Sequence, residues 1–238
     1  MLNKVIIILT FSLFSTFVYG VNTEIYSNGS ISADTLSLFL SMGNRSLGSE
    51  LANEFASIYI EEAKAEGVNW DIAFVQMCLE TGFLKFGGLV DDTQNNYCGL
   101  GSFDNRQGAS FPTIREGVRA HIQHLKAYSS FDKLNKKVLD PRFSLVKRGS
   151  ATNITELAGR WAEDSRYGSK LISLLKRVNN LESRGDVFLA TVPINNVYTV
   201  EPSSVDLENI SSKVEEIDIK SNKNIDNSAK KKKVGWLG

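Results

Sequence analysis

The sequence has no excess of either charge and carries none of the common cofactor-binding motifs, and these shortages exclude several classes of function. It contains 27 Lys and Arg residues against 27 Asp and Glu residues. Nucleic-acid binding requires a basic excess, so we expect no nucleic-acid partner. The chain also lacks a glycine-rich phosphate loop, a dinucleotide-binding fingerprint and a nucleophilic-serine elbow. The sequence therefore implies no cofactor.

Histidine is equally scarce, and the two histidines do not predict a metal site. His121 and His124 stand three residues apart within one expected helix. A zinc site would need a third ligand at a defined spacing, and none is evident. We interpret the pair as a polar face of the helix, so no metal is implied.

The only two cysteines, Cys78 and Cys98, leave two arrangements open. In an oxidising compartment an even number of cysteines favours a disulfide, which would tie the helix of Cys78 to the loop that follows it. The alternative is two separate buried thiols, since free cysteine often behaves as a small apolar core residue. A catalytic cysteine is not favoured, because neither histidine is near a cysteine in the sequence.

The first 20 residues have the pattern of a secretory signal peptide. Lys4 precedes an apolar run over residues 5–18, and Val18-Tyr19-Gly20 provides a small-residue cleavage site. The run is shorter than the about 20 residues that a membrane span needs. We expect export to the periplasm, the cell wall or the medium, with no stable membrane span. An uncleaved N-terminal anchor is the alternative.

Apolar residues at helical spacing predict a mainly helical domain. Helices are expected over 33–42, 49–66 and 169–182, and a further helix should open near 153. Asn69 is the expected N-cap of a helix that stops at Gly82, and Thr113 with Glu116 forms a capping box for another.

Beyond Gly185 the character of the chain changes, and residues 186–200 are expected to form a short strand or an extended arm. From Glu201 onward the chain is Ser, Asn, Lys, Glu, Asp and Ile, with too little apolar surface to offset the entropy of ordering. We therefore divide the chain into a signal peptide (1–20), an N-terminal segment (21–29), one folded domain (30–184) and an extended, largely disordered tail (185–238).

Glu80 is the most informative residue, because it is a lone carboxylate at the end of the apolar helix 70–80. Desolvation among apolar neighbours and the negative end of a helix both raise the pKa of a carboxyl group. A carboxyl group that stays protonated can act as the general acid for a glycosidic oxygen. The alternative is a surface glutamate at a frayed helix end.

Four segments, in order, resemble the bacterial glucosaminidases of glycoside hydrolase family 73. They are Leu79-Glu80-Thr81-Gly82-Phe83, Asn96-Tyr97-Cys98-Gly99-Leu100, the stretch from Ser110 to Tyr128, and Leu157-Ala158-Gly159-Arg160-Trp161-Ala162 with Tyr167-Gly168. The resemblance implies a mainly α, lysozyme-like (α+β) fold, with a small β-hairpin lobe beside the cleft around residues 104–108.

The resemblance also implies an exported peptidoglycan hydrolase that acts as a monomer on glycan strands. The expected activity is an endo-β-N-acetylglucosaminidase, which cuts the β-1,4 bond on the reducing side of N-acetylglucosamine with Glu80 as general acid. A muramidase or a lytic transglycosylase would share the fold and the helical glutamate. A non-catalytic wall-binding module is the alternative from another class, although it would have no need for Glu80.

The second catalytic group is less well defined. The acids downstream of Glu80 are Asp91, Asp92, Asp104 and Glu116. By resemblance we favour Asp104 in the hairpin, and we set Glu116 aside as a capping residue. A substrate-assisted route, in which the acetamido group of the sugar attacks, would instead need an orienting group such as Tyr167. The expected substrate-binding residues are Asn96, Tyr97, Phe103 and Trp161.

Overall fold

Helix α3 (Trp70–Glu80) forms the centre of the computed structural model, which describes residues 20–88, 90–102 and 108–191. Every residue from Trp70 to Cys78 is buried, because α1, α2, α4 and α5 all contact this helix. A helix of 11 residues is marginal in water by itself, so tertiary packing stabilises α3. The end of α3 is therefore a rigid platform.

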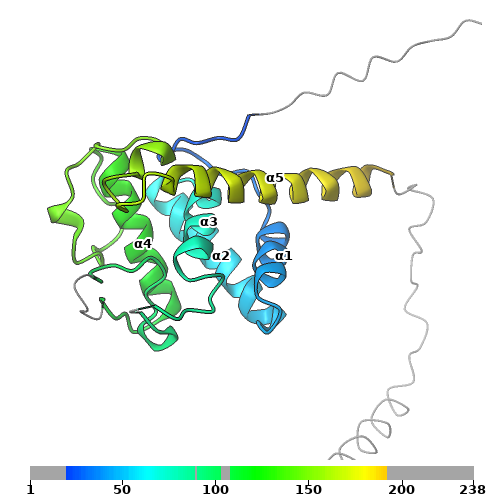
Figure 1. The fold of residues 1–238 in the computed structure, drawn as a ribbon, viewed down its shortest axis with the longest axis horizontal. Helices are drawn as coiled ribbons and strands as arrows, with labels where there is room; N and C mark the ends of the chain where they lie inside the picture. The colour runs from blue at the N-terminus through cyan, green and yellow to red at the C-terminus, as the bar shows by residue number, and fades with distance from the viewer. Residues whose placement is uncertain (1–19, 89, 103–107, 192–238) are drawn as a thin grey trace, which may run out of the picture. The chain divides into compact units, whose positions relative to one another are not determined.

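Four other α-helices surround α3. They are α1 (Ala33–Gly43), α2 (Ser49–Glu66), α4 (Ile114–Ser129) and α5 (Tyr167–Thr191), and the short 3-10 helices η1 (Asp92–Gln94), η2 (Phe143–Leu145) and η3 (Ile154–Leu157) lie in the connections. Helix α2 contacts α1 and α4, whereas α5 contacts α1, α3 and η3. In Figure 1, α5 runs along one side of the other helices.

Several predicted helix ends are confirmed by the caps. The Asn69 side chain accepts hydrogen bonds from the backbone N–H groups of Asp71 and Ile72, and Gly67 ends α2 in the left-handed conformation. Thr113 accepts from the N–H of Glu116 as expected. Glu116 does not complete the capping box, because its buried Oε2 has no hydrogen-bond partner among the described residues.

The mainly helical prediction is confirmed, but the β-hairpin lobe is not seen. The described residues contain two isolated β-bridges and no strand. The Ala109 N–H donates to the Leu100 carbonyl at 2.7 Å, so the two sides of the expected hairpin meet there. The expected turn falls on residues 103–107, which lie outside the described residues.

Two helix bounds also differ from the prediction. The helix expected near residue 153 is only the 3-10 helix η3, because the chain turns at Gly159, whose φ is +75°. Helix α5 begins at Tyr167 and continues to Thr191, past the expected domain end and into the residues expected to form a strand or an extended arm. The predicted signal peptide and most of the predicted tail lie outside the described residues.

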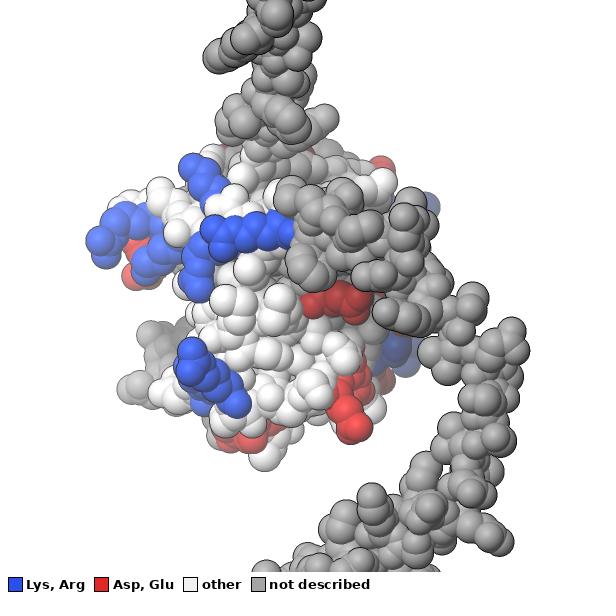
Figure 2. Space-filling view, turned by 90° about the vertical axis from the view of Figure 1, so that its right-hand side faces the viewer, with Lys and Arg blue, Asp and Glu red and all other residues white. Residues whose placement is uncertain are grey.

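The described surface agrees with the balanced composition. On the face in Figure 2, Lys and Arg side chains gather towards the upper left, acidic side chains lie lower and to the right, and uncharged atoms fill the area between. Neither sign covers this face. A search of the described helices for a membrane-spanning candidate finds none that is long and apolar enough.

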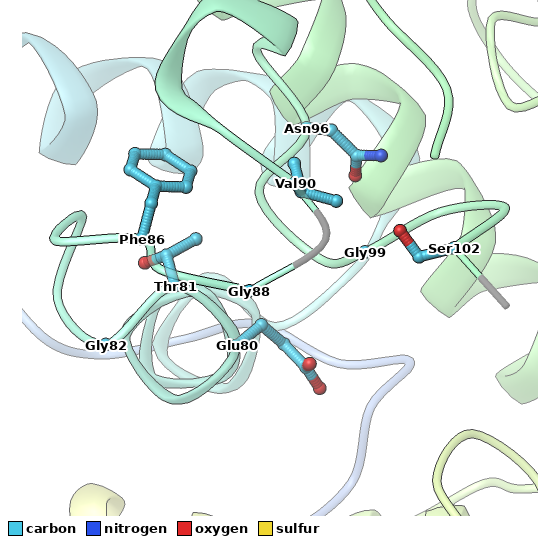
Figure 3. Close-up of a pocket in the computed structure, with 9 residues that line it drawn as sticks. All are labelled: Glu80, Thr81, Gly82, Phe86, Gly88, Val90, Asn96, Gly99 and Ser102. Carbon is cyan, nitrogen blue, oxygen red and sulfur yellow. The ribbon is translucent and has the colours of Figure 1, made fainter. Parts of the chain in front are cut away.

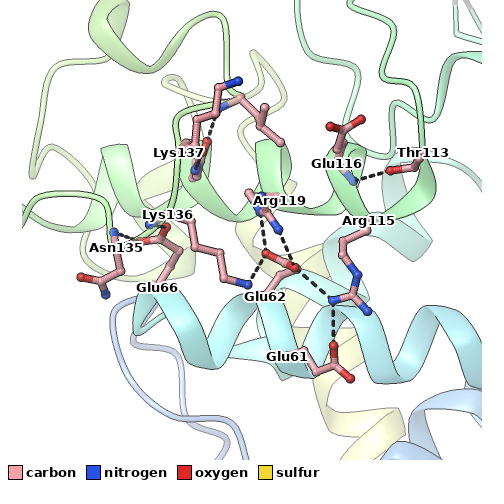
Figure 4. Close-up of polar contacts among 12 residues, drawn as sticks. Glu61, Glu62, Glu66, Thr113, Arg115, Glu116, Arg119, Asn135, Lys136 and Lys137 are labelled. Carbon is pink, nitrogen blue, oxygen red and sulfur yellow. Dashed lines mark hydrogen bonds and ion pairs between the residues drawn. The ribbon is translucent and has the colours of Figure 1, made fainter.

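Two buried carboxylates on α2 hold α4 and the segment after it (Figure 4). Glu62 accepts from Arg119 Nε at 2.8 Å, Lys136 Nζ at 2.9 Å and Arg115 at 3.1 Å. Burial alone would raise the pKa of Glu62, but these donors outweigh it and lower the pKa to about 2. Its neighbour Glu66 pairs with Lys126 Nζ at 2.9 Å.

We expect Glu62→Gln to lower the free energy of unfolding at pH 7 by on the order of 2 kcal/mol, because three cations lose their counter-charge. A carboxylate with a lowered pKa stabilises the fold above its ordinary pKa of 4.5, and that stability disappears as the pH falls towards 2. The difference in unfolding free energy between wild type and Glu62→Gln should therefore become smaller in acid, as measured by urea unfolding at several pH values. Glu61→Gln, at an exposed partner of Arg115, is the control. If Glu62→Gln and Glu61→Gln lower the free energy of unfolding equally, the three ion pairs of Glu62 do not stabilise the fold as described.

Candidate active site

Glu80 is the last residue of α3, and the chain reverses directly after it in a left-handed turn. Gly82, Phe83 and Leu84 have φ values of 58°, 62° and 58°. For residues other than glycine this conformation costs roughly 1–2 kcal/mol each. Thr81 offsets part of that cost, since its Oγ1 accepts the N–H of Leu84 at 2.8 Å. The turn brings the following segment back past Glu80.

A cavity of about 270 Å³ opens at Glu80 (Figure 3). It is lined by Glu80, Thr81, Gly82, Phe86, Gly88, Val90, Asn96, Gly99 and Ser102. In Figure 3 the Glu80 carboxylate projects from the end of α3 near Gly88, and Asn96 and Ser102 lie across the cavity. Among the described residues that line it, Glu80 is the one with a charged side chain.

Both hydrogen bonds to the Glu80 carboxylate converge on one oxygen. The Tyr167 hydroxyl donates to Oε1, and the Trp161 indole N–H donates to the same atom at 3.1 Å. Partial desolvation beside the packed aromatic rings raises the pKa of Glu80, although the residue keeps exposed surface, and these two hydrogen bonds offset the rise only in part. Among the described residues none bonds to Oε2, so Oε2 is the carboxylate oxygen that is free to carry an acidic proton.

The support for Glu80 extends through the core as a one-way chain of hydrogen bonds. Gln76 Nε2 donates to the Tyr167 hydroxyl at 2.8 Å, so Gln76 Oε1 accepts from His121 Nε2 at 3.0 Å. His121 Nδ1 is then the acceptor for the Tyr59 hydroxyl, also at 3.0 Å. Burial lowers the pKa of His121 to about 3, which keeps the ring neutral. Every donor in the chain points towards Glu80.

The prediction that the histidines form a polar helix face is wrong, because both side chains are buried. His124 Nδ1 lies 2.8 Å from Asp140 Oδ2. The two imidazole rings lie 5.8 and 5.0 Å from the Trp161 ring, measured between ring centroids. The histidines therefore support the residue that donates to Glu80. The described residues contain no cluster of three or more His, Cys, Asp or Glu side chains suited to a metal.

Of the predicted site residues, the structure brings together Glu80, Trp161 and Tyr167. Tyr97 lies elsewhere, because its ring packs on Phe55 and its hydroxyl donates to the Asn95 side chain at 2.8 Å. Phe103 and Asp104 lie outside the described residues.

Asn96 lines the cavity, but its amide is already bonded to the backbone. Its Nδ2 donates to the carbonyls of Leu100 and Ala109, both at 3.0 Å, and its Oδ1 accepts the Leu100 N–H at 2.9 Å. The side chain is buried. These contacts give Asn96 the role of closing the base of the 100–109 loop.

The disulfide is not present, because Cys78 and Cys98 are both free, buried thiols. Cys78 belongs to the main hydrophobic cluster, whereas Cys98 packs in a second cluster with Leu100, Phe111 and Ala120. Burial raises the pKa of each thiol. Of the two arrangements that the sequence leaves open, the structure has the separate thiols.

The sequence analysis missed Gln76, His121 and Tyr59 as supports of the site. One signal was available: Gln76 stands four residues before Glu80 in an otherwise apolar helix, so both side chains share a face. The contacts of His121 and Tyr59 depend on how α2 and α4 pack against α3, which no local pattern records.

The cavity at Glu80 adjoins further cavities, and we refer to the row of them as the groove. A second cavity shares Gly99 and Ser102 with it and extends past Trp161. A third shares His124, Tyr128, Arg142 and Arg160 with the second. Such a groove can hold several units of a chain-like ligand, with the Glu80 carboxyl group at its side.

Comparison with known proteins decides the family. The family model named Glucosaminidase, described as mannosyl-glycoprotein endo-beta-N-acetylglucosaminidase, matches residues 56–180, more than half of the chain. The chain belongs to the glucosaminidase family. The matched region contains Glu80, Trp161 and Tyr167.

Two individual proteins resemble this glucosaminidase family member. An uncharacterised protein of Borreliella burgdorferi is 50% identical over 133 residues, which are 56% of this chain and 65% of that protein. The alignment therefore spans less than two thirds of the relative. The crystal structure of S. aureus autolysin E in complex with the muropeptide NAM-L-Ala-D-iGlu has a TM-score of 0.43 at 16% identity, covering 68% of this chain and 72% of that one.

We expect Tyr167→Phe to raise the pKa of Glu80 further, because the carboxylate loses a hydrogen bond that stabilises its charge. The alkaline limb of the pH profile of kcat/KM should move to higher pH. Tyr97→Phe removes a hydroxyl that does not contact Glu80 and should leave that limb in place. If the alkaline limb stays in place in Tyr167→Phe, or moves equally in both variants, Tyr167 does not control the pKa of Glu80.

We also expect Cys78 and Cys98 to resist iodoacetamide in the native protein and to react fully after unfolding without a reductant. Mass spectrometry of the intact chain should then count two modified thiols. Alkylation that requires prior reduction would reveal a disulfide and contradict the structure.

Proposed function

We propose that the protein is an exported endo-β-N-acetylglucosaminidase that cleaves peptidoglycan glycan strands, with Glu80 as the general acid. The bond cut lies on the reducing side of N-acetylglucosamine. The family supports glycoside hydrolysis. The polymeric wall substrate is supported by the groove that continues on from Glu80, because a chain-like ligand needs binding surface on both sides of the reacting bond.

One observation carries the proposal: Glu80 lines the cavity with its Oε1 held by two donors, while its Oε2 has no hydrogen-bond partner among the described residues. Partial desolvation favours the protonated form, while Tyr167 and Trp161 hold Oε1. An acid prepared in this way suits proton transfer to a leaving oxygen, because Oε2 is free to carry the proton and the raised pKa favours the protonated form.

The reaction begins as Glu80 Oε2–H protonates the glycosidic oxygen and the bond from that oxygen to the anomeric carbon breaks. The electron pair of that bond leaves with the oxygen, and positive charge develops on the sugar. A second group must meet this charge. It is either Asp104 or the carbonyl oxygen of the substrate's own acetamido group. Water then completes hydrolysis, with the Glu80 carboxylate accepting its proton.

The hydrogen bonds of Tyr167 favour a supporting role over a direct one. Its oxygen accepts from Gln76 and its proton is donated to Glu80. A phenol in this state has no second proton for the acetamido group. We therefore propose that Tyr167 orients Glu80, and that the substrate or Asp104 supplies the second function.

We expect Glu80→Gln to abolish turnover of purified sacculi while leaving the fold intact, because glutamine cannot donate the proton. The products are reduced with borohydride and analysed by mass spectrometry, with Glu50→Gln, an exposed acid at the start of α2, as the control. Reduced N-acetylglucosamine ends that disappear in Glu80→Gln are the expected result.

Other product ends would change the assignment. Reduced muramic ends would indicate a muramidase, and anhydro-muramic ends a lytic transglycosylase. Binding to sacculi without any product would indicate a wall-binding module. A Glu80→Gln protein that is folded and active would rule out Glu80 as the general acid.

A further inference from the structure

His124 and Asp140 form a buried polar pair beside the groove, and the proton transfer from Glu80 does not use it. His124 Nδ1 lies 2.8 Å from Asp140 Oδ2, and the Asp140 side chain is fully buried. The other carboxylate oxygen accepts the backbone N–H of Arg142 at 2.8 Å. The N–H of Asp140 itself donates to Gln123 Oε1 at 3.1 Å. The backbone and the side chain of Asp140 are therefore both fixed, and Asp140 fixes the imidazole ring in turn.

This contact determines which nitrogen of the His124 ring is left over. A carboxylate accepts hydrogen bonds and does not donate them, so the ring donates from Nδ1. The second nitrogen, Nε2, has no hydrogen-bond partner among the described residues. It is also not one of the fully buried side-chain atoms without a partner, which in the described part of the chain are Ser102 Oγ and Glu116 Oε2. Nε2 therefore keeps accessible surface.

The open space next to His124 is the groove, because His124 lines both the second and the third cavity. The ring packs against Trp161 and Tyr128, at 5.0 and 5.3 Å between ring centroids. Of the side-chain surface, 9% remains exposed. A small exposed area that includes a hydrogen-bonding atom suits one directed contact better than it suits stacking.

His121, the other histidine of the chain, shows the arrangement of a purely structural imidazole in this core. It is fully buried. Its Nδ1 pairs with the Tyr59 hydroxyl and its Nε2 with the Gln76 side chain, both at 3.0 Å. His124 pairs internally through Nδ1 alone among the described residues. The difference between the two histidines indicates that Nε2 of His124 is available to a ligand.

We propose that His124 binds the glycan, with Nε2 forming a hydrogen bond to a hydroxyl group of a sugar unit next to the scissile bond. This inference rests on the proposed function. A hydroxyl group can both donate and accept. It therefore pairs with a neutral ring, which accepts at Nε2, and with a protonated ring, which donates there. The contact requires no charge on the ligand.

Trp161 connects this contact to the acid. Its indole N–H donates to Glu80 Oε1 at 3.1 Å, and its ring packs against His124. A sugar unit held at His124 Nε2 therefore lies beside the side chain that orients Glu80. Binding energy from this unit, which does not react, then helps to hold the scissile bond at the acid.

The test follows both histidines by nitrogen-15 NMR while glycan is added. The probe is the peptide-free tetrasaccharide of peptidoglycan, and the protein is full-length Glu80→Gln, which prevents turnover. We expect the His124 Nε2 signal to move with the same saturation curve as binding measured by calorimetry. His121 is the internal control, because both of its nitrogens are bonded within the core, and its signals should stay in place.

Two amide substitutions in the Glu80→Gln protein separate the roles of the ring nitrogens. The amide of asparagine lies near the Nδ1 position, so His124→Asn keeps a donor for Asp140 and removes the group at Nε2. The amide of glutamine reaches the Nε2 position, so His124→Gln keeps a polar group for the sugar. We expect His124→Asn to bind the tetrasaccharide about tenfold more weakly, in line with one lost hydrogen bond, and His124→Gln to recover part of that loss. A structural role would give the opposite order, because His124→Gln is the variant that breaks the contact with Asp140.

Several results would overturn the role of His124. They are a His124 signal that stays in place as the tetrasaccharide binds, equal movement of both histidines, undiminished binding by His124→Asn, equal losses in the two variants, and failure of the tetrasaccharide to bind. If the variants do not fold, the NMR titration still decides, because it uses the native histidines.

The proposed function is judged separately, by the products that wild type releases from sacculi. A hydrolase that depends on Glu80 but whose His124 does not respond to the glycan would leave the enzyme standing and remove the binding residue alone. Movement of the His124 signal without any product from wild type would keep the binding residue and remove the enzyme.

Discussion

The site depends on one oxygen atom, Glu80 Oε1, where three separate parts of the chain meet. Glu80 ends α3, Tyr167 begins α5, and Trp161 lies in the turn after η3. Neither donor can reach the carboxylate unless α5 has packed on α3. The position of the acid is thus fixed by the hydrophobic core, and its other oxygen has no hydrogen-bond partner among the described residues.

Polar groups behind that oxygen connect it to the rest of the core. Tyr59 on α2, His121 on α4 and Gln76 on α3 form a continuous series of donors that leads to Tyr167. A buried polar group without a partner costs about 1–3 kcal/mol, so the series is stable only when every member is paired. This requirement selects one rotamer and one tautomer at each position. It thereby gives the site a rigidity that apolar packing alone would not supply.

Much of this could be predicted from local patterns in the sequence, and the failures share one cause. The cap at Asn69, the position of Glu80 at a helix end and the helical character of the domain all follow from residues close together in the chain. Whether Cys78 and Cys98 pair, which the sequence left open, and the burial of His121, which it did not predict, depend on which faces of α3 and α4 are covered by other helices. Asn96 illustrates the limit, because its amide is taken up by carbonyls on both sides of a loop whose closure only the tertiary structure reveals.

The central claim is that protein surroundings raise the pKa of Glu80, and a direct titration tests it. Carbon-13 NMR of the glutamate side-chain carboxyl groups, with the Glu80 signal assigned by its loss in Glu80→Gln, follows this group as the pH changes. The account predicts a midpoint above the ordinary value of 4.5. A midpoint at or below that value would mean that Tyr167 and Trp161 stabilise the charged form more than desolvation opposes it, and Glu80 would then not be prepared as a general acid.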